Sequence, residues 1–391
     1  MDFFKRAKEL ESETVKHRRY IHENAEVGLD LPMAREYVLN ELRALGIEAE
    51  RCGYGIAATL GTPGKVILLR ADMDALPMEE ESGETFASKN GEAAHTCGHD
   101  FHTAMLLTAA KMLKENERNL SGTVKLMFQP AEETLEGAKD MITAGVLENP
   151  KVDVALAVHV AAGNLPESLV MYNDIGTMMY SADMFKIDIR GKGAHGAYPH
   201  FGIDPINIGN HICLRLQVLA KEESTGERAC LITVGHFEAG STANVIPDEA
   251  LLEGSVRAVS KELRDKLVAD IERTVHETAK EFGGNADFEI VSGVPPLVCD
   301  SHLTDTFIQY IGELDVPNLT FHKGISSTAS EDFAYIASSV PSAFMYLAAG
   351  FQDERGDFPA HNPKVIFNEN VCSLGAASLA HCAVRWLADN R

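Results

Sequence analysis

The chain has 391 residues, 45% of them hydrophobic and 24% charged, and a formal net charge of −23 at pH 7. This length exceeds what one hydrophobic core usually supports, and the composition is that of a globular protein, so we expect two folded domains and neither a disordered nor a fibrous chain. The acidic excess opposes encounter with polyanions, which argues against nucleic acid or a membrane surface as a partner. The charged N-terminal stretch and the seven cysteines without C-x-x-C spacing predict a cytoplasmic protein without a disulfide framework.

The first half of the chain alternates helical and strand patterns. Apolar residues at helical spacing predict helices near 2–22, 32–45, 102–115 and 134–144, and Gly46 and Gly145 are placed to end two of them. Near-continuous apolar runs predict strands at 66–70, 123–128 and 152–158. Such runs are typical of strands covered on both faces in a largely parallel sheet, so we expect an α/β layer.

The pattern changes near Ala182, where residues alternate with period two. The predicted order is then a strand at 182–190, a helix at 204–220, strands at 230–237 and 249–257, a helix at 261–282 and a strand at 286–292. This β-α-β-β-α-β order is typical of a ferredoxin-like α+β domain. After Pro295 the α/β pattern resumes with helices near 301–313 and 330–339, a strand at 342–348 and a helix near 370–388.

We therefore expect a discontinuous α/β domain at 1–181 and 294–391, with a mixed, largely parallel sheet flanked by helices. A ferredoxin-like α+β domain is predicted to be inserted at 182–293.

Polar residues follow the predicted strands at the sheet edge where α/β proteins bind ligands. They are Asp72 and Asp74 after the first run, Glu132 and Glu133 after the second, His159 after the third and His361 beyond the strand at 342–348, with Cys97 and His99 in the segment HTCGHD before a helix. A mixture of sulfur, nitrogen and oxygen donors suits Zn²⁺, Mn²⁺, Co²⁺ or Ni²⁺ better than Mg²⁺ or Ca²⁺. Five such ligands suggest two ions, which together can activate a water and polarise a carbonyl oxygen. Of the two adjacent glutamates, one would then bind metal and the other transfer a proton.

Each residue taken alone has a simpler interpretation. His159 is compatible with an ordinary hydrogen-bonded histidine, and Cys97 with a small buried hydrophobic residue. Glu132 and Glu133 are compatible with charges in the first turn of a helix, and the two aspartates with a turn before Pro77. The positions of all these residues at the ends of strands favour a shared site.

Eight ordered motifs carry a resemblance to a known family. They are RRYIHENAEVG (18–28), RADMDALP (70–77), HTCGHDFHT (95–103), FQPAEE (128–133), GKGAHGAYPH (191–200), TANVIPDEALLEGSVR (242–257), ASEDF (329–333) and HNP (361–363). From end to end, the chain resembles the aminoacylase, hippurate-hydrolase and auxin-conjugate-hydrolase branch of the dinuclear metallopeptidases. The resemblance implies a metal-dependent amidohydrolase that cuts the amide bond of small N-acyl amino acids.

The resemblance also implies roles for single residues. The implied ligands of two divalent ions are Cys97, His99, Glu133, His159 and His361. Glu132 is the implied general acid and base, and Asp74 is expected to orient one of the ligand imidazoles.

The inserted domain resembles the family's lid or dimerisation domain. This implies a homodimer, with His195 as a donor to the oxyanion and with Asn244 and Arg257 as substrate clamps. The simpler interpretations are a histidine in a glycine-rich turn and an exposed ion pair. The sequence departs from the usual pattern at HVAAGNLPESL (159–169) and at HNP, and these departures bear on the choice of substrate.

Two alternatives stay open at this stage. The first is a dipeptidase of the same family, which needs room for a free amino group on the acyl side of the bond. The second is a catalytically silent metal-binding protein with the same fold. The presence of Glu132 favours an enzyme.

Overall fold

The computed structural model describes residues 1–224 and 229–391 and divides into two compact units. The first unit comprises Met1–Met178, Val298–Ser326 and Asp332–Arg391. The second unit comprises Met179–Leu297 and Ser327–Glu331. Each unit thus combines segments that are far apart in the sequence.

The first unit contains a mixed sheet with the strand order β1-β2-β4-β3-β5-β16-β6-β15. Its strands are β1 (Ala49–Cys52), β2 (Gly55–Gly61), β3 (Val66–Asp72), β4 (Thr123–Gln129), β5 (Val154–Ala161), β6 (Leu169–Tyr172), β15 (Thr320–Lys323) and β16 (Ser342–Ala348). Strands β4, β3, β5 and β16 run parallel to one another, and antiparallel pairs lie on either side. Every residue of β3 is buried, which explains the continuous apolar run in the sequence.

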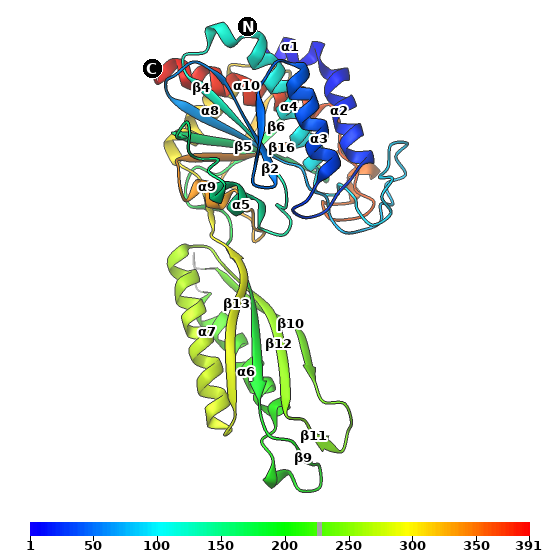
Figure 1. Cartoon of the computed structure of the whole chain (residues 1–391), viewed down its shortest axis with the longest axis vertical. Helices are drawn as coiled ribbons and strands as arrows, with labels where there is room; N and C mark the ends of the chain where they lie inside the picture. Colours follow the sequence, from blue (N-terminus) through cyan, green and yellow to red (C-terminus); the bar gives the residue numbers. More distant parts are fainter. Residues whose placement is uncertain (225–228) are drawn as a thin grey trace. The chain divides into compact units, whose positions relative to one another are not determined.

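The first unit also contains helices, most of which pack on this sheet and the others on neighbouring helices. They are α1 (Phe3–Glu9), α2 (Glu11–Glu23), α3 (Pro32–Ala44), α4 (His99–Glu115), α5 (Gly137–Thr143), α8 (Ser301–Gly312), α9 (Ala334–Ala337) and α10 (Val371–Asp389). Helices α4 and α10 contact each other and the central strands β3 and β5 (Figure 1). The predicted α/β class with a large, mostly parallel sheet is therefore confirmed.

Three sequence predictions concern where these helices begin and end. Gly46 and Gly145 have φ angles of 68° and 93° and follow α3 and α5, so the predicted helix ends are confirmed. The single helix predicted at 2–22 is wrong, because the chain turns at Leu10 and lets α1 pack on α10 while α2 packs on α4. The helix predicted at 330–339 is only the short α9.

Helix α10 is long and apolar enough to cross a membrane by length and composition alone. However, 78% of its most apolar window is buried within the fold. It contacts α1, α4 and α8 as well as the sheet. These contacts are those of a central helix in a hydrophobic core.

The second unit contains an antiparallel sheet with the strand order β10-β12-β8-β13. Along the chain its elements are β8 (Ala182–Arg190), α6 (Pro205–Glu223), β10 (Cys230–Ala239), β12 (Glu249–Ala258), α7 (Lys261–Glu281) and β13 (Asn285–Val294). Helices α6 and α7 contact each other and the sheet, and the helices share one apolar core with the sheet (Figure 1).

The remaining elements are short. Strands β9 (Ala194–His195) and β11 (Val245–Ile246) pair with each other, and β7 (Thr177–Met179) and β14 (Leu297–Val298) lie where the chain passes between the units. Short 3-10 helices are found at Glu117–Asn119, Pro199–Phe201 and Glu354–Asp357.

Candidate metal centre

The predicted metal ligands all belong to the first unit and come from four of its segments. Cys97 precedes α4, and His99 is the first residue of that helix. Glu133 lies in the turn between β4 and α5, and His361 lies between β16 and α10. The sequence placed His159 after a strand, but it lies inside β5, which continues to Ala161. The strand is longer than the apolar run because the residues on either side of His159 are also buried.

The structure brings the five predicted ligands together in two groups that share one thiol. The ligand atoms of Cys97, His99 and His159 all lie within 4.8 Å of one another, and so do those of Cys97, Glu133 and His361. The Cys97 Sγ atom lies 3.6 Å from His159 Nε2 and 3.4 Å from His361 Nε2. Cys97 would therefore contribute its sulfur to both groups if each of them held a cation.

The chemistry of these side chains fits two divalent cations. His99 Nε2 is buried and, among the described residues, has no hydrogen-bond partner, which is costly unless a cation contacts it. Desolvation raises the pKa of the Cys97 thiol to about 12, and burial holds the pKa of His159 well below its usual value. A cation stabilises a thiolate and binds a neutral imidazole, so both side chains are suited to be ligands.

Asp74 forms hydrogen bonds with two of the predicted ligands. His99 Nδ1 lies 2.9 Å from the Asp74 carbonyl oxygen and 3.2 Å from Asp74 Oδ1, so this nitrogen carries the proton and Nε2 faces the cluster. The other carboxylate oxygen of Asp74 accepts a hydrogen bond from the Glu133 amide at 3.0 Å. Asp74 thus contacts His99 on one side and the turn that carries Glu133 on the other.

Backbone geometry also fixes the ligands. Gly98 has a φ of 89°, and a Cβ atom there would lie 2.3 Å from Val160 Cγ2, so only glycine fits between Cys97 and His99. His361 has a φ of 66°, a conformation that costs a non-glycine residue on the order of 1 kcal/mol. Its amide donates to the Thr96 carbonyl at 2.9 Å, which ties it to the segment that carries Cys97.

Glu132 lies beside the cluster and is only 6% exposed. Its Oε2 atom lies 3.9 Å from His99 Nε2, and its Oε1 atom accepts from the Asp332 amide at 3.4 Å. The Asp332 carboxylate is itself held by Gln129 Nε2 at 2.7 Å and by the Ala138 amide at 2.8 Å. The carboxylate of Glu132 therefore lies in a fixed position next to the ligands.

A buried arginine links the two sides of the site. Arg70 is 2% exposed and donates to Asp72 at 2.7 Å, to Gln129 at 2.9 Å and to Asp332 at 3.1 Å. The sequence prediction missed Arg70 and Asp332, although both lie in the motifs RADMDALP and ASEDF. A charged residue within the apolar run of β3 was the available signal, because a buried arginine requires acidic partners.

The other predicted residues, His195, Asn244 and Arg257, belong to the second unit. His195 Nδ1 accepts from the Ala197 amide at 3.0 Å, which leaves the proton on Nε2 in the neutral ring. The Asn244 carbonyl oxygen accepts from the Gly196 amide at 2.8 Å, so Asn244 lies next to the histidine loop. Arg257 donates to the Thr328 carbonyl oxygen at 2.9 Å. Their roles toward a substrate remain predictions.

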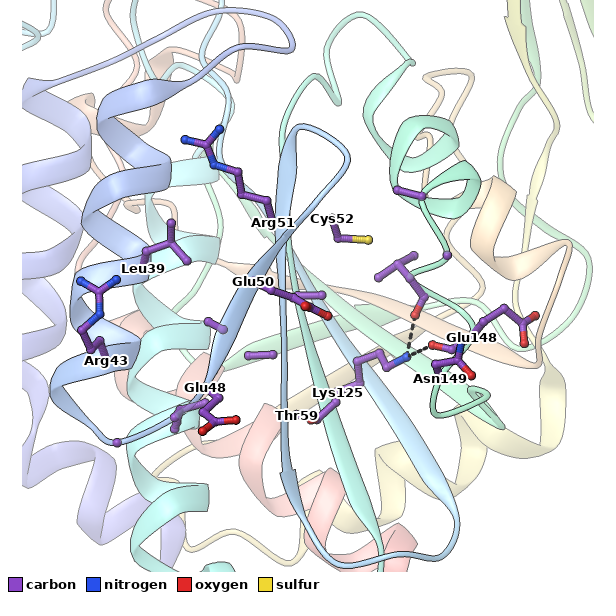
Figure 2. Close-up of a pocket in the computed structure, with 18 residues that line it drawn as sticks. Leu39, Arg43, Glu48, Glu50, Arg51, Cys52, Thr59, Lys125, Glu148 and Asn149 are labelled. Atoms are coloured by element: carbon purple, nitrogen blue, oxygen red, sulfur yellow. Dashed lines mark hydrogen bonds between the residues drawn. The ribbon is translucent and has the colours of Figure 1, made fainter.

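A cavity of about 940 Å³ lies elsewhere in the first unit, against β1, β2 and β4 (Figure 2). Its lysine, Lys125, donates to the carbonyl oxygens of Val146, Glu148 and Pro150 at 2.6–2.9 Å. All three protons of this ammonium group are therefore used within the protein. None of the predicted ligands lines the cavity, and it offers no comparable cluster of donors.

A sheet that carries two cation sites with a shared thiol, next to a buried carboxylate, defines a dinuclear metallohydrolase. Residues 68–385 match the family described as Peptidase family M20/M25/M40, and the chain belongs to this family. The N-acetyl-L-cysteine deacetylase of Bacillus subtilis (strain 168) is 34% identical over 97% of this chain and 90% of its own length. The hippurate hydrolase of Campylobacter jejuni is 33% identical over 97% of this chain and 98% of its own length.

A solved structure shows the same fold. The YXEP protein of Bacillus subtilis, described as a dinuclear metal binding peptidase from the M20 family, superposes with a TM-score of 0.83 and 28% identity. The superposition covers 97% of this chain and 99% of that one. The protein is thus a metal-dependent amidohydrolase of this family with a site built for two divalent cations.

Proposed function

We propose that the protein hydrolyses the amide bond of N-acyl amino acids of the acetyl, benzoyl or indole-acetyl type and releases the free amino acid and a carboxylic acid. The observation that carries this proposal is the pair of ligand groups that share Cys97 beside the buried Glu132. The names of the deacetylase and hippurate hydrolase relatives support an N-acyl amino acid as the substrate class.

In this proposal Cys97, His99 and His159 hold one cation, and Cys97, Glu133 and His361 hold the other. The ions are drawn from Zn²⁺, Mn²⁺, Co²⁺ and Ni²⁺, which suit mixed sulfur, nitrogen and oxygen ligands. When bound, the ions supply Lewis acidity toward the carbonyl oxygen and toward the attacking water.

The residues around the ions handle protons and orientation. Glu132 takes a proton from the attacking water and delivers it to the leaving nitrogen, because its carboxylate is held beside the ligand cluster by the Asp332 amide. Asp74 keeps His99 in the tautomer that presents Nε2. His195 donates its Nε2 proton to the developing oxyanion, and Asn244 and Arg257 bind the substrate carboxylate and its surroundings.

We further propose that residues 182–293 form a ferredoxin-like lid and dimerisation domain inserted into a catalytic domain at 1–181 and 294–391. The strand order and the two helices on one face of the second unit support this assignment. The active form is then a cytoplasmic homodimer.

A substrate panel tests the proposed function. Acetyl, benzoyl and indole-acetyl amino acids are incubated with the enzyme loaded with Zn²⁺, Mn²⁺ or Co²⁺, and the release of free amine is measured. We expect release from at least one acyl class, its loss with a chelator and its return with metal. Faster cleavage of the matching dipeptides would identify a dipeptidase instead, and no release with any metal would identify a catalytically silent protein.

Two variants test the shared thiol. Cys97→Ala removes a ligand from both groups, whereas His361→Ala removes a ligand from one. We therefore expect Cys97→Ala to lower the affinity for both ions and His361→Ala to lower it for a single ion, as measured by metal content after dialysis. Full occupancy and activity of Cys97→Ala would overturn the assignment of the five ligands.

A further inference from the structure

His102 is a buried histidine for which neither the ligand set nor the proposed mechanism has a use. It lies in α4 three residues after His99, so both side chains project from the same face of the helix, and it is 2% exposed. Its ring lies 4.4 Å from the His159 ring, measured between centroids. A polar ring at this place must have hydrogen-bond partners, and these partners indicate what it does.

The partners of His102 define its tautomer. Its Nε2 atom accepts a hydrogen bond from the Val160 amide at 2.8 Å, so this nitrogen carries no proton. The proton therefore lies on Nδ1, which donates to Asp72 Oδ1 at 2.5 Å. Asp72 is fully buried, and its other oxygen accepts from Arg70. The two hydrogen bonds thus hold the ring in one orientation and select one tautomer of the neutral imidazole.

The bond to Val160 replaces a missing strand contact. The ladder between β3 and β5 ends at the pair Arg70 and Ala157, although β5 continues to Ala161 and stays paired with β16 on its other side. Beyond this point the backbone groups of β5 that face β3 need other partners. His102 supplies the acceptor for the Val160 amide, and His159 Nδ1 donates to the Val160 carbonyl oxygen at 2.7 Å.

The Val160 residue therefore connects two imidazoles. With its proton on Nδ1, His159 presents the lone pair of Nε2 toward Cys97 Sγ, 3.6 Å away. The orientation of the His159 ring depends on the direction of the Val160 carbonyl. His102 holds the amide of the same residue, so it also restricts the rotation of this carbonyl. The aromatic contact between the two rings restricts His159 further.

We propose that His102, locked by Asp72, is a positioning residue that holds the Val160 backbone and thereby aims His159 Nε2 at the cation shared with Cys97 and His99. The inference deepens the proposed function and rests on its ligand set. It predicts that loss of the His102–Val160 bond weakens the ion bound by His159 and spares the ion bound by Glu133 and His361.

The same residue is also part of a third group of ligand atoms, formed by Asp72, His99 and His102. This group is a poor cation site, because both ring nitrogens of His102 are already engaged with Asp72 and Val160. Arg70 also provides a positive charge 2.7 Å from Asp72 Oδ2. A role in orientation uses every contact that His102 makes, whereas a role as a ligand would break one of them.

Two polar substitutions separate the contacts of the ring. In His102→Gln the side-chain oxygen reaches the position of Nε2 and can accept from the Val160 amide. In His102→Asn the shorter side chain reaches only the position of Nδ1 and leaves the amide without an acceptor. His17→Asn is the matched control, because His17 is also a buried helical histidine and bonds to the Tyr37 hydroxyl at 2.7 Å, outside the site.

The affinity for Co²⁺ is measured by competition with a chelating dye, together with the thiolate-to-cobalt absorption. We expect His102→Asn to bind one of its two ions 10–100-fold more weakly and to keep the absorption of the other, whereas His102→Gln and His17→Asn stay within about three-fold of the wild type. In the metal-free protein, the Val160 amide is expected to exchange with solvent at least about ten-fold faster in His102→Asn than in His102→Gln.

Equal Co²⁺ affinity in His102→Asn and the wild type would overturn the inference, and so would an equal loss of both ions or a loss in His102→Gln as large as in His102→Asn. A wild-type protein that binds no pair of ions would overturn the ligand set on which the proposed function rests. Because neither readout involves a substrate, an error in the acyl group affects neither result.

Discussion

Single residues of the site show how burial and charge are balanced against each other. The thiol of Cys97 is desolvated and, without a cation, holds its proton to a pKa of about 12. The neighbouring carboxylate of Glu133 has a pKa below its usual value despite burial, because His361 and His99 lie beside it. The cluster thus combines a group that needs a cation to ionise with a group that is already negative.

The proposed role of Glu132 predicts that its substitution separates metal binding from turnover. The Glu132→Gln variant keeps the shape of the side chain but loses the ability to accept a proton. We expect unchanged metal content and a turnover number roughly 10²–10⁴-fold lower, since this is the usual contribution of a general acid or base. Near-normal turnover of the metal-loaded variant would reject the assigned role.

Glu80 provides a pH-dependent contribution to stability. Burial raises the pKa of Glu80, but its hydrogen bonds outweigh this effect and lower the pKa to about 2. They are the bond with His22, at 3.0 Å, and those from Ser82 and Ser88. Its stabilising effect is therefore complete above the usual pKa of 4.5 and is lost as the pH falls toward 2. His22 is protonated throughout this range in both the folded and the unfolded state, because burial is outweighed by its acidic partners, which raise its pKa.

The Glu80→Gln variant should have a free energy of unfolding that depends less on pH. Urea unfolding of both proteins between pH 6 and pH 2.5 is expected to show the wild type losing more stability, by on the order of 2 kcal/mol. Both proteins release metal on acidification, so the difference between them isolates Glu80. Parallel stability curves would contradict the assignment.

At the scale of helices and strands, the sequence predicted the elements that have long apolar patterns. The predicted strand at 342–348 coincides with β16, and the predicted helix at 261–282 matches α7 to within one residue. The prediction missed short strands such as β1 and β15, because most of their residues are exposed and polar and their pairing depends on distant parts of the chain.

The same distinction holds for the site. Residue type and position at strand ends sufficed to select the five residues that the structure brings together, from Cys97 to His361. The sequence did not show which histidine Asp74 contacts, because His99 comes close to Asp74 only when α4 packs on β3. His102 was quoted within a motif but given no role, since its use depends on where the ladder of β3 ends.

Arg70 is the only positively charged residue of β3. It joins this strand to Gln129 of β4 and to Asp332 in the segment before α9. In Arg70→Met the carboxylates of Asp72 and Asp332 stay buried without their cation, so we expect a loss of about 3–5 kcal/mol in the free energy of unfolding. Arg43→Met on the exposed surface of α3 is the control, with an expected change within about 0.5 kcal/mol. Denaturant unfolding measures both, and a loss below about 1 kcal/mol in Arg70→Met would contradict the structural role.

For the whole molecule, the proposed dimer must overcome the charge of the chain. Each copy has a formal net charge of −23, so two copies repel each other unless apolar contacts offset the repulsion. The second unit exposes apolar side chains on α6 and on β10. Leu214 and Val218 of α6 are 59% and 54% exposed, and Leu231 of the edge strand β10 is 45% exposed. The opposite edge strand, β13, presents Asp287 and Glu289, charges of the kind that keep edge strands apart.

We therefore expect the copies to associate through α6 and β10. A Leu214→Glu and Val218→Glu double variant should sediment as a monomer at micromolar concentration, while Val291→Glu on β13 stays dimeric.

Because salt screens the repulsion between the two acidic chains, the wild-type dimer should also tighten as the ionic strength rises from about 10 mM to 150 mM. Over this range the screening length shortens from about 30 Å to 8 Å. A dimer that survives in the double variant, or that weakens with salt, would contradict an interface through α6 and β10.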